Sequence, residues 1–533
     1  MIQITGRRAE RALLLLLYLG GKRSGSAFSA FRIRAPVSTA HTPSAVHVCR
    51  PTRRALSSAA IETAAEPQGL EARAEDLQPV QGRKLSKAVV VARGKARLFW
   101  DGNPLVYGGA ISRVEGDPIA GDVVDVIDSS GKFIAWGVFN PDSMYRVRVL
   151  AREGESAADS RDVGAVVKER LLTARDARRA IGIPNAKTDT YRLVNGEGDR
   201  LSGLVIDVFA GVVGVSSSAV WVEAFRPEIE AALGEVFGTD ATEIIWRRSD
   251  GRLQQDGWKG NNSGAGAAET TGAVKDEYSP EAAATAAVGQ ESIEGGAEEK
   301  LDGEGAKVAA RRLRSDAPTT VVREHGLEYE VRPQFGQKTG FYCDQRESRA
   351  AIRELSKDKN VLDMFCYSGG FALNAAAGGA RRVVAVDSSQ PALEEAQVNA
   401  ARNNLEAVTE FVKDDALSFM KTAQAKGEKY DVVIVDPPKL APNKKALPRA
   451  TSRYKRLNAA ALELVAPGGI LVTFTCSAAM TQGGGFVGVV QSAAATAGRT
   501  ITLLKTVGPA ADHVTNPCYP EGAYLTGAFF YVV

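Results

Sequence analysis

Cysteine and histidine are scarce in this sequence of 533 residues, which contains five cysteines and four histidines. The cysteines are scattered and form no C-x-x-C pair; they are Cys49, Cys343, Cys366, Cys476 and Cys518. This spacing indicates neither a disulfide framework nor a zinc site, so we expect no metal, and a reducing compartment fits.

Long hydrophobic runs are also lacking. The stretch "ALLLLLYL" (12–19) is far shorter than the roughly 20 residues that span a bilayer, so no membrane partner is expected. The net charge of +3 is too small to identify a nucleic-acid-binding protein, because a basic groove can coexist with acidic segments elsewhere. A content of 44% hydrophobic and 24% charged residues is typical of globular proteins with two or three domains at this length.

Acidic residues are almost absent from residues 1–61, where Glu10 stands against many arginines. Together with abundant Ser and Ala, this composition predicts an organelle-targeting presequence. A signal-like stretch followed by "GSAFSAFR" is similar to presequences of complex plastids, and the arginine content alone fits a mitochondrion equally well. A cytoplasmic protein with a disordered N-terminus is the alternative.

Residues 254–307 have little apolar periodicity and are rich in Gly, Ala, Glu and Ser. Such a composition predicts a disordered insertion without a catalytic role.

The remaining sequence divides into three modules. Short strand-like segments over 88–150, including "RLFWDGNPLVYGGAI", predict a small barrel or sandwich. A mixed α/β unit, with a helix near 221–237, either helps to grip the substrate or is a spacer. From Lys359 onward, apolar runs alternate with helix-length segments, which predicts an α/β fold with a doubly wound, mostly parallel sheet. The expected module boundaries are 86–152, 160–335 and 336–533.

Polar residues punctuate the predicted strands of the last module, namely Asp363, Asp387, Asp415, Asp436 and Cys476. Ligands of such sheets bind at the carboxyl ends of the strands. We therefore expect these four carboxylates and the thiol to gather at one edge of the sheet.

The turn after the first of these strands suits a nucleotide. Gly369 and Gly370 let a ligand approach the backbone, and Asp387 is placed to accept hydrogen bonds from ribose hydroxyls, unless it only caps a helix. The same pattern serves NAD, but the glycines of this turn do not form the sequence G-x-G-x-x-G. S-adenosylmethionine carries a sulfonium and an amino group, which suit the Asp363 carboxylate better than a pyrophosphate does.

Five segments carry a close resemblance: "FGQKTGFYCDQRESR", "DMFCYSGGFALNAA", "AVDSSQPALEEAQVNAARNN", "DVVIVDPPKLA" and "APGGILVTFTCS". They resemble class I methyltransferases of the RlmI type, a family of 23S ribosomal RNA cytosine-C5 methyltransferases. The likeness covers residues 86–250 and 319–533 and includes an N-terminal PUA domain, with Leu105 where that domain usually has tryptophan. It implies a Rossmann-like, seven-stranded sheet preceded by a PUA-like RNA-binding barrel and a mixed α/β central domain.

The resemblance implies that S-adenosylmethionine is the cofactor. Gln337, Lys338 and Thr339 are assigned to its pocket by the resemblance alone. The other residues assigned to this pocket are Asp363, Tyr367, Ser368, Gly369, Gly370, Asp387, Ser388 and Asp415.

The resemblance also places the target cytosine near Asp436 and Cys476. Cytosine C5 is a weak nucleophile, and a thiolate that adds at C6 converts the ring to an enamine that attacks through C5. Cys476 is the predicted thiolate, although a buried free cysteine is usually an inert, small apolar residue. Asp436 is expected to hold the N3 or N4 edge of the base. The base that removes the C5 proton is not identified by the sequence.

Pro437, Pro438 and Lys439 are expected to contact the substrate, and the two prolines stiffen the loop. Amino-group methyltransferases usually have an aromatic residue after these prolines, so Lys439 favours cytosine C5 over an exocyclic nitrogen. Pro438 stands where other RNA cytosine methyltransferases carry a second cysteine, which implies a one-cysteine cycle. Lys439 as a solvated surface charge is the alternative.

We therefore expect an organellar methyltransferase whose partner is large-subunit ribosomal RNA. A homodimer stays open. The basic stretch 444–456 either holds RNA phosphates or is an exposed helix face. Methylation of another RNA base or position is one alternative, and a non-catalytic ribosome assembly factor is another.

Overall fold

The computed structural model describes residues 87–155, 159–241, 243–259, 318–334 and 340–533. Three expectations therefore concern residues outside this described part: the presequence (1–61), the portion of the insertion from 260 to 307, and the cofactor residues Gln337, Lys338 and Thr339.

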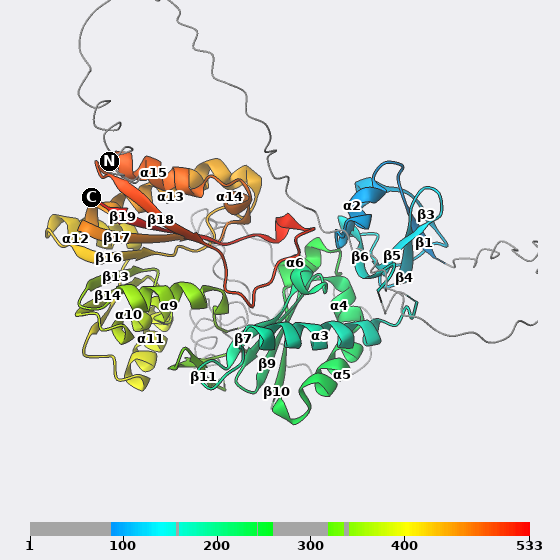
Figure 1. Cartoon of the computed structure of the whole chain (residues 1–533), viewed down its shortest axis with the longest axis horizontal. Coiled ribbons are helices and arrows are strands. Elements are labelled where there is room, and N and C mark those ends of the chain that lie inside the picture. The colour runs from blue at the N-terminus through cyan, green and yellow to red at the C-terminus, as the bar shows by residue number, and fades with distance from the viewer. Residues whose placement is uncertain (1–86, 156–158, 242, 260–317, 335–339) are drawn as a thin grey trace, which may run out of the picture. The chain divides into compact units, whose positions relative to one another are not determined.

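The first sheet is built from short apolar strands separated by turns, in the order β2-β6-β5-β4-β1-β3 (Figure 1). Its strand pairs are antiparallel except for the parallel pair of β1 and β4. Val89, Val126 and Val147 lie in its core, together with Phe99 from helix α2. The elements are β1 (Ala88–Val91), α2 (Ala96–Trp100), β2 (Leu105–Tyr107), β3 (Ile111–Glu115), β4 (Val123–Ile127), β5 (Phe133–Phe139) and β6 (Tyr145–Arg152).

The second unit combines a four-stranded sheet, in the order β10-β9-β8-β7, with helices that bury one apolar face against it. A hairpin of β11 and β12 follows in the chain. The elements are α3 (Val163–Ala180), β7 (Thr190–Asn195), β8 (Leu204–Phe209), β9 (Val212–Ser217), α4 (Val220–Ala224), α5 (Arg226–Phe237), β10 (Glu243–Arg248), α6 (Asp250–Gln255), β11 (Thr320–Glu324) and β12 (Leu327–Val331).

The third unit contains the predicted seven-stranded sheet, in the order β15-β14-β13-β16-β17-β19-β18. The first five strands in this order are parallel, and β19 runs antiparallel between β17 and β18. The strands are β13 (Asn360–Met364), β14 (Arg382–Asp387), β15 (Thr409–Lys413), β16 (Tyr430–Val435), β17 (Val465–Thr475), β18 (Ile501–Val507) and β19 (Thr526–Val532). The doubly wound fold expected from the apolar runs is therefore confirmed.

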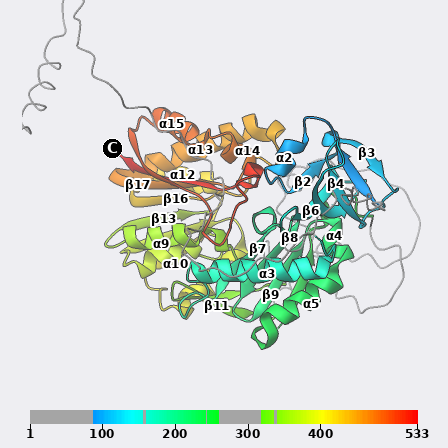
Figure 2. The same ribbon diagram turned by 45° about the vertical axis from the view of Figure 1, so that its right-hand side comes forward.

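Helices cover both faces of this sheet (Figures 1 and 2). Residues of α12, α13 and α15 pack on one face around Met420, Tyr454 and Phe486, and residues of α9, α10 and α11 pack on the other around Ile352 and Phe371. The helices are α9 (Arg346–Leu355), α10 (Gly370–Ala377), α11 (Gln390–Arg402), α12 (Ala416–Ala425), α13 (Leu447–Leu464), α14 (Ala478–Gln482) and α15 (Phe486–Thr496). Because helices cover both faces of the sheet, the carboxyl ends of its strands are where a ligand is expected to bind.

Three local expectations need correction. Residues 96–100 form helix α2 instead of β-structure. Phe99 is the buried residue of this short helix, and burial of one side chain per turn suits a helix. The helix near 221–237 is two helices, since Pro227 starts α5 afresh after Phe225. Residues 254–259, which composition groups with the insertion, belong to the second unit, where the carboxylate of Asp256 accepts from Ser143 and Arg148.

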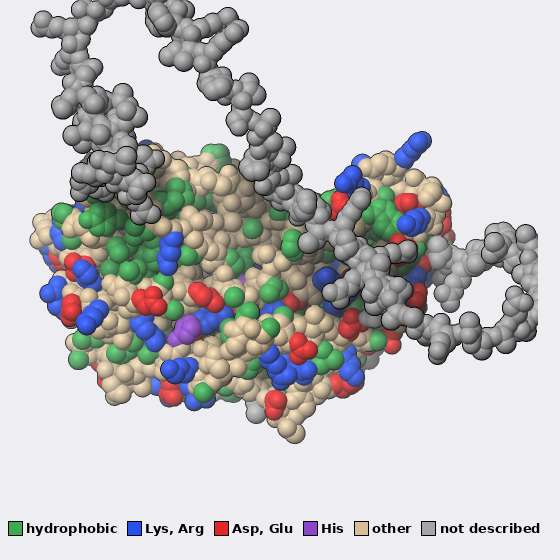
Figure 3. Space-filling model, viewed as in Figure 1, with side chains coloured by type: hydrophobic (Ala, Val, Ile, Leu, Met, Phe, Trp, Pro, Cys, Tyr) green, Lys and Arg blue, Asp and Glu red, His purple; other side chains and the backbone are tan. Residues whose placement is uncertain are grey.

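Among the described helices, none is long and apolar enough to cross a membrane. The described residues also contain no cluster of three or more His, Cys, Asp or Glu side chains that could hold a metal ion. On the face drawn in Figure 3, side chains of the two charge signs are interspersed.

Candidate active site

The loop after β13 has an unusual backbone conformation. Phe365, Tyr367 and Gly369 have φ angles of 66°, 49° and 86°, in the left-handed region that non-glycine residues seldom adopt. A side chain at Gly369 would have a Cβ 3.2 Å from the Cβ of Ala396, so the turn into α10 also needs glycine for space. The loop therefore forms a tight cradle at the carboxyl end of β13.

Asp363 lies beneath this loop and is fully buried. Its Oδ2 accepts a hydrogen bond from the backbone N–H of Ala372 at 3.0 Å, whereas its Oδ1 has no partner among the described residues. Burial, with the negative charges of Asp436 and Asp387, raises the pKa of Asp363 well above its usual value. An unpartnered buried carboxylate oxygen is costly, which indicates that a ligand cation completes this site.

Asp387 is the last residue of β14, two residues before the N-cap of α11, whereas Asp415 is itself the N-cap of α12. Asp387 accepts from the N–H of Tyr367 at 3.0 Å through one oxygen and from the N–H of Ser389 at 2.8 Å through the other. Asp415 is exposed and caps α12 through Oδ1. Each carboxylate oxygen has two lone pairs, so Asp387 fixes the loop and keeps capacity for ribose hydroxyls.

The other predicted cofactor residues lie on the same loops. Tyr367 packs edge-on against Tyr342, with ring centroids 5.4 Å apart, while Ser368 is buried and Ser388 is exposed. Burial raises the pKa of Tyr342 well above its usual value, assisted by the charges of Tyr367, Asp344 and Cys476. Tyr342 therefore contacts the cofactor loop through Tyr367 and lies close enough to Cys476 for their charges to interact.

Asp436 follows β16 and is held by a residue that no motif argument singled out. The side-chain amide of Gln345 donates to Asp436 Oδ2 at 3.0 Å. Gln345 belongs to the segment "FGQKTGFYCDQRESR", but it lies 91 residues from Asp436 in sequence, so no spacing pattern links the two residues. Because Gln345 donates to this oxygen, the Asp436 carboxylate is oriented as an acceptor.

Cys476 follows β17, and its side chain is half-buried. Its Sγ lies 3.9 Å from the carbonyl oxygen of Pro437, to which the thiol donates. Pro437 is buried, and Pro438 and Lys439 are exposed. The thiol and the Asp436 loop are thus brought together, as the position of both residues at strand ends predicted.

Lys439 lies close enough to Cys476 for their charges to interact. Desolvation and the positive charge of Arg252 lower the pKa of Lys439, and the charge of Cys476 opposes this effect. The exposed lysine is therefore a cation beside the thiol, which fits a substrate-facing position as well as a surface one.

A buried hydroxyl cluster behind the thiol was missed by the sequence argument. Tyr454 is fully buried on α13, and its hydroxyl accepts from Thr475 at 2.8 Å and lies 3.1 Å from the hydroxyl of Ser477. The Ser477 hydroxyl also accepts from the backbone N–H of Ala441 at 3.0 Å. Tyr454 thus holds both neighbours of Cys476, and Ser477 joins them to the loop that begins at Asp436.

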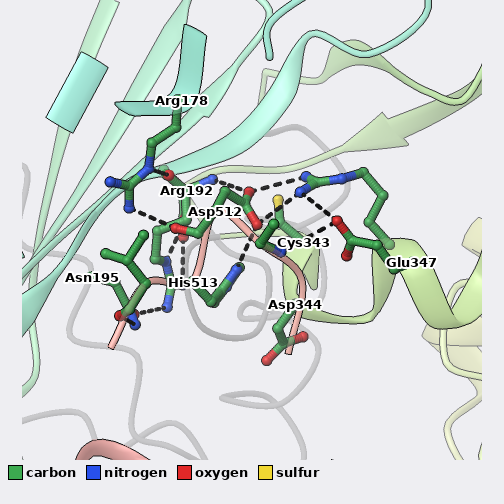
Figure 4. Close-up of polar contacts among 12 residues, drawn as sticks. Arg178, Arg192, Asn195, Cys343, Asp344, Glu347, Asp512 and His513 are labelled. Carbon is green, nitrogen blue, oxygen red and sulfur yellow. Dashed lines mark hydrogen bonds and ion pairs between the residues drawn. The ribbon is translucent and has the colours of Figure 1, made fainter. Parts of the chain in front are cut away.

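A second missed feature is the buried network around Asp512 (Figure 4). The carboxylate of Asp512 pairs with the guanidinium of Arg346 at 2.8 Å, and its Oδ2 accepts from the N–H of Arg192 at 2.8 Å. In the same C-terminal stretch, Tyr524 donates to Asp344, the neighbour of Gln345, at 2.8 Å. The network therefore ties residues 512–524 to the turn that holds Asp436.

Comparison with known proteins identifies the family. Residues 89–152 match the PUA-like domain, and residues 309–501 match the S-adenosylmethionine-dependent methyltransferase family. The chain is 33% identical over 442 residues to the ribosomal RNA large subunit methyltransferase I of Klebsiella pneumoniae (strain 342). The aligned residues make up 82% of this chain and 96% of that protein. The chain belongs to the ribosomal RNA large subunit methyltransferase I family.

Further members and solved structures agree with this assignment. The family member from Escherichia coli O139:H28 (strain E24377A / ETEC) is 33% identical over 444 residues, covering 83% of this chain and 98% of its own length. A proposed methyltransferase solved with SAH superposes with a TM-score of 0.62 at 19% identity, over 83% of this chain and 99% of that one. This structural likeness supports the fold, and the sequence resemblance to the family is confirmed.

The cradle suits S-adenosylmethionine, the cofactor of this methyltransferase. Asp363 offers an unpartnered buried oxygen for a cationic group, and Asp387 offers acceptor capacity beside the loop. The described residues of the pocket therefore fit the group that the family requires.

Proposed function

We propose that this chain transfers a methyl group from S-adenosylmethionine to C5 of a cytosine in large-subunit ribosomal RNA, through a covalent adduct with Cys476. The observation that carries the proposal is the position of the Cys476 thiol, half-buried beside Pro437, with the Tyr454 hydroxyl cluster at the residues on either side of it. The names of the family members support ribosomal RNA as the substrate. The arginine-rich residues 1–61 support a plastid or a mitochondrion as the location.

In the proposed reaction, the thiolate of Cys476 forms a bond with C6 of the cytosine, and the electron density gained by the ring makes C5 nucleophilic. Asp436, oriented by Gln345, accepts from the N4 amino group and holds the ring against the thiol. When bound, S-adenosylmethionine supplies the electrophilic methyl group. A base then removes the C5 proton, the C5–C6 double bond re-forms, and the thiolate leaves C6.

Asp363, Asp387 and the loop from Phe365 to Gly369 are the described groups that would hold the cofactor. Lys439 supplies a cation near the thiol, which favours the thiolate that the first step requires. Pro437 and Pro438 stiffen the loop on which Asp436 and Lys439 stand.

The test is a trapping experiment with RNA that contains 5-fluorocytidine. Fluorine at C5 leaves no proton to remove, so wild-type protein should form a stable complex with labelled RNA on denaturing electrophoresis. Cys476→Ala should form none and should lose at least about a thousandfold in 5-methylcytidine formation, while binding S-adenosylmethionine normally. Cys518→Ala, which removes an exposed thiol, is the matched control and should behave as wild type.

Nucleoside analysis separates the alternatives. Formation of 5-methylcytidine at the normal rate by folded Cys476→Ala would rule out the covalent mechanism. A different methylated nucleoside would move the reaction to another base or position. RNA binding without methyl transfer by wild type would favour an assembly factor.

A further inference from the structure

Helix α13 and the turn before it carry a row of cations on one side. Lys445, Arg449, Arg453 and Arg456 are spaced by four, four and three residues, which places them on one face of a helix. All four are exposed, whereas Tyr454 on the opposite face is fully buried. We call these four residues the α13 cation row.

No member of the α13 cation row forms an ion pair with any residue that the structure describes. The sequence from 437 to 462 contains neither Asp nor Glu, although the whole chain has 63 acidic residues against 66 Lys and Arg. Elsewhere the surface mixes the two signs, as in the pair of Arg382 and Glu410, whose nitrogen and oxygen are 2.7 Å apart. The row is therefore an exception to the charge pattern of this protein.

Helix stability does not explain the row. Like charges four residues apart, such as Arg449 and Arg453, destabilise an isolated helix by about 0.2–0.5 kcal/mol per pair. Cations near the start of a helix also oppose the helix dipole, which favours them at the end. An arrangement that breaks local rules without a compensating partner in the fold is typical of a surface that binds something else.

The row is connected to the candidate active site through the helix itself. Arg453 and Lys455 flank Tyr454, whose hydroxyl contacts Thr475 and Ser477 on either side of Cys476. The turn that carries Lys445 comes after the loop of Asp436, Pro437 and Lys439, and Ala441 in that loop bonds to Ser477. The row therefore lies on the outer face of the helix whose inner face contacts the residues on either side of Cys476, and its first member, Lys445, follows the loop of Asp436 in the chain.

We propose that the α13 cation row binds backbone phosphates of the substrate RNA next to the target nucleotide. The partner is RNA because a line of exposed, unpaired cations matches a chain of phosphates, and arginine forms bidentate contacts with them. This inference deepens the proposed function, since it takes RNA as the substrate. It does not depend on which atom of the base is methylated.

The test compares two triple variants that remove the same charge. Arg449→Gln, Arg453→Gln and Arg456→Gln are combined in one protein. The control combines Lys357→Gln, Lys359→Gln and Lys426→Gln, three exposed lysines that precede the amino ends of β13 and β16. Fluorescence anisotropy measures the affinity for a labelled 30-nucleotide single-stranded RNA of mixed sequence at several salt concentrations, without methyl transfer.

The row variant should bind this RNA about tenfold or more weakly at 0.1 M salt. The slope of log affinity against log salt should become shallower by about 2, as expected when three phosphate contacts on a single strand are lost. The control should match wild type in both quantities. In methylation assays with ribosomal RNA, the row variant should have a raised KM for RNA and an unchanged kcat.

Normal calorimetric binding of S-adenosylmethionine by both variants shows that they are folded. An unchanged affinity and salt slope in the row variant would overturn the inference, as would an equal loss in the control. Because RNA binding is read without turnover, a product other than 5-methylcytidine would refute the proposed chemistry and leave this result standing.

Discussion

At the scale of single residues, Asp363 is the most informative side chain of the cofactor pocket. It is buried, and one of its oxygens has no partner among the described residues. Its raised pKa means that the cofactor-free protein keeps this carboxyl protonated to a higher pH than usual. By linkage, the stability gained from this proton is lost as the pH rises through the raised pKa. A bound ligand cation has the opposite effect, because it favours the ionised form of the Asp363 carboxyl over the protonated form.

We therefore predict that affinity for S-adenosylmethionine rises with pH through the raised pKa of Asp363. The useful pH range is limited by the ligand's own amino group, which deprotonates near a pH of about 8. Asp363→Asn should weaken binding by about 1–3 kcal/mol and abolish the rise, because an amide has no charge to gain. Calorimetric titration across this pH range measures both effects.

Asp358→Asn is the control for this prediction, since Asp358 is exposed and precedes the amino end of β13. Its affinity profile should match that of wild type. A rise of the same size in Asp363→Asn would assign the pH dependence to another group.

At the scale of elements, α13 has two faces with separate contacts. Its buried face packs into the core, where the ring of Tyr454 meets Phe486 edge-on with centroids 5.6 Å apart. The hydroxyl of Tyr454 extends this packing to the end of β17, at the residues on either side of Cys476. The helix therefore sets where the thiol stands relative to the loop of Asp436.

Tyr454→Phe should lower kcat by about tenfold, because it keeps the ring and removes the hydroxyl that positions the thiol. The KM for S-adenosylmethionine should not change, and the pH profile of Cys476 alkylation by iodoacetamide should shift. Steady-state kinetics and mass spectrometry provide these readouts. The lost hydrogen bonds should cost about 1 kcal/mol of stability.

Tyr430→Phe is the matched control, because Tyr430 is also buried and its hydroxyl donates to Glu428 at the opposite end of the sheet. It should lose comparable stability with no change in kcat. Equal kinetic losses in the two variants would reduce Tyr454 to a general packing role.

At the scale of the whole molecule, Asp512 joins parts of the chain that are distant in sequence. Its partners Arg192 and Arg346 lie 320 and 166 residues away. Burial alone would raise the pKa of Asp512, but the contacts with His513 and Arg346 outweigh it and lower the pKa. The stabilisation by Asp512 is therefore present above the normal carboxyl pKa and is lost as the pH falls through the lowered value.

Asp512→Ala should lower the free energy of unfolding by about 3–5 kcal/mol at neutral pH, because the buried Arg346 would keep only its longer contact with Glu347, at 3.5 Å. Urea unfolding followed by circular dichroism measures this loss. Glu410→Ala removes the exposed partner of Arg382 and should cost less than about 1 kcal/mol. A loss of that small size for Asp512→Ala would show that the network contributes little to folding.

The sequence was most informative where a pattern is local. The apolar runs before Asp363, Asp387 and Asp436 predicted the parallel strands, because a strand buried on both faces must be apolar throughout. The short helix at residues 96–100 escaped prediction, since one buried aromatic side chain in five residues fits a strand as well as a helix.

By itself, the sequence determined the fold class, the cofactor class and the position of Cys476 at a strand end, because strand periodicity and loop motifs depend on residues that are close together in the chain. Only the tertiary structure decided what surrounds these groups. Gln345 reaches Asp436 across 91 residues, and Tyr454 reaches the neighbours of Cys476 across 21 and 23. Such contacts arise from how helices pack on the sheet, and the spacing of residues along the chain carries no direct record of that packing.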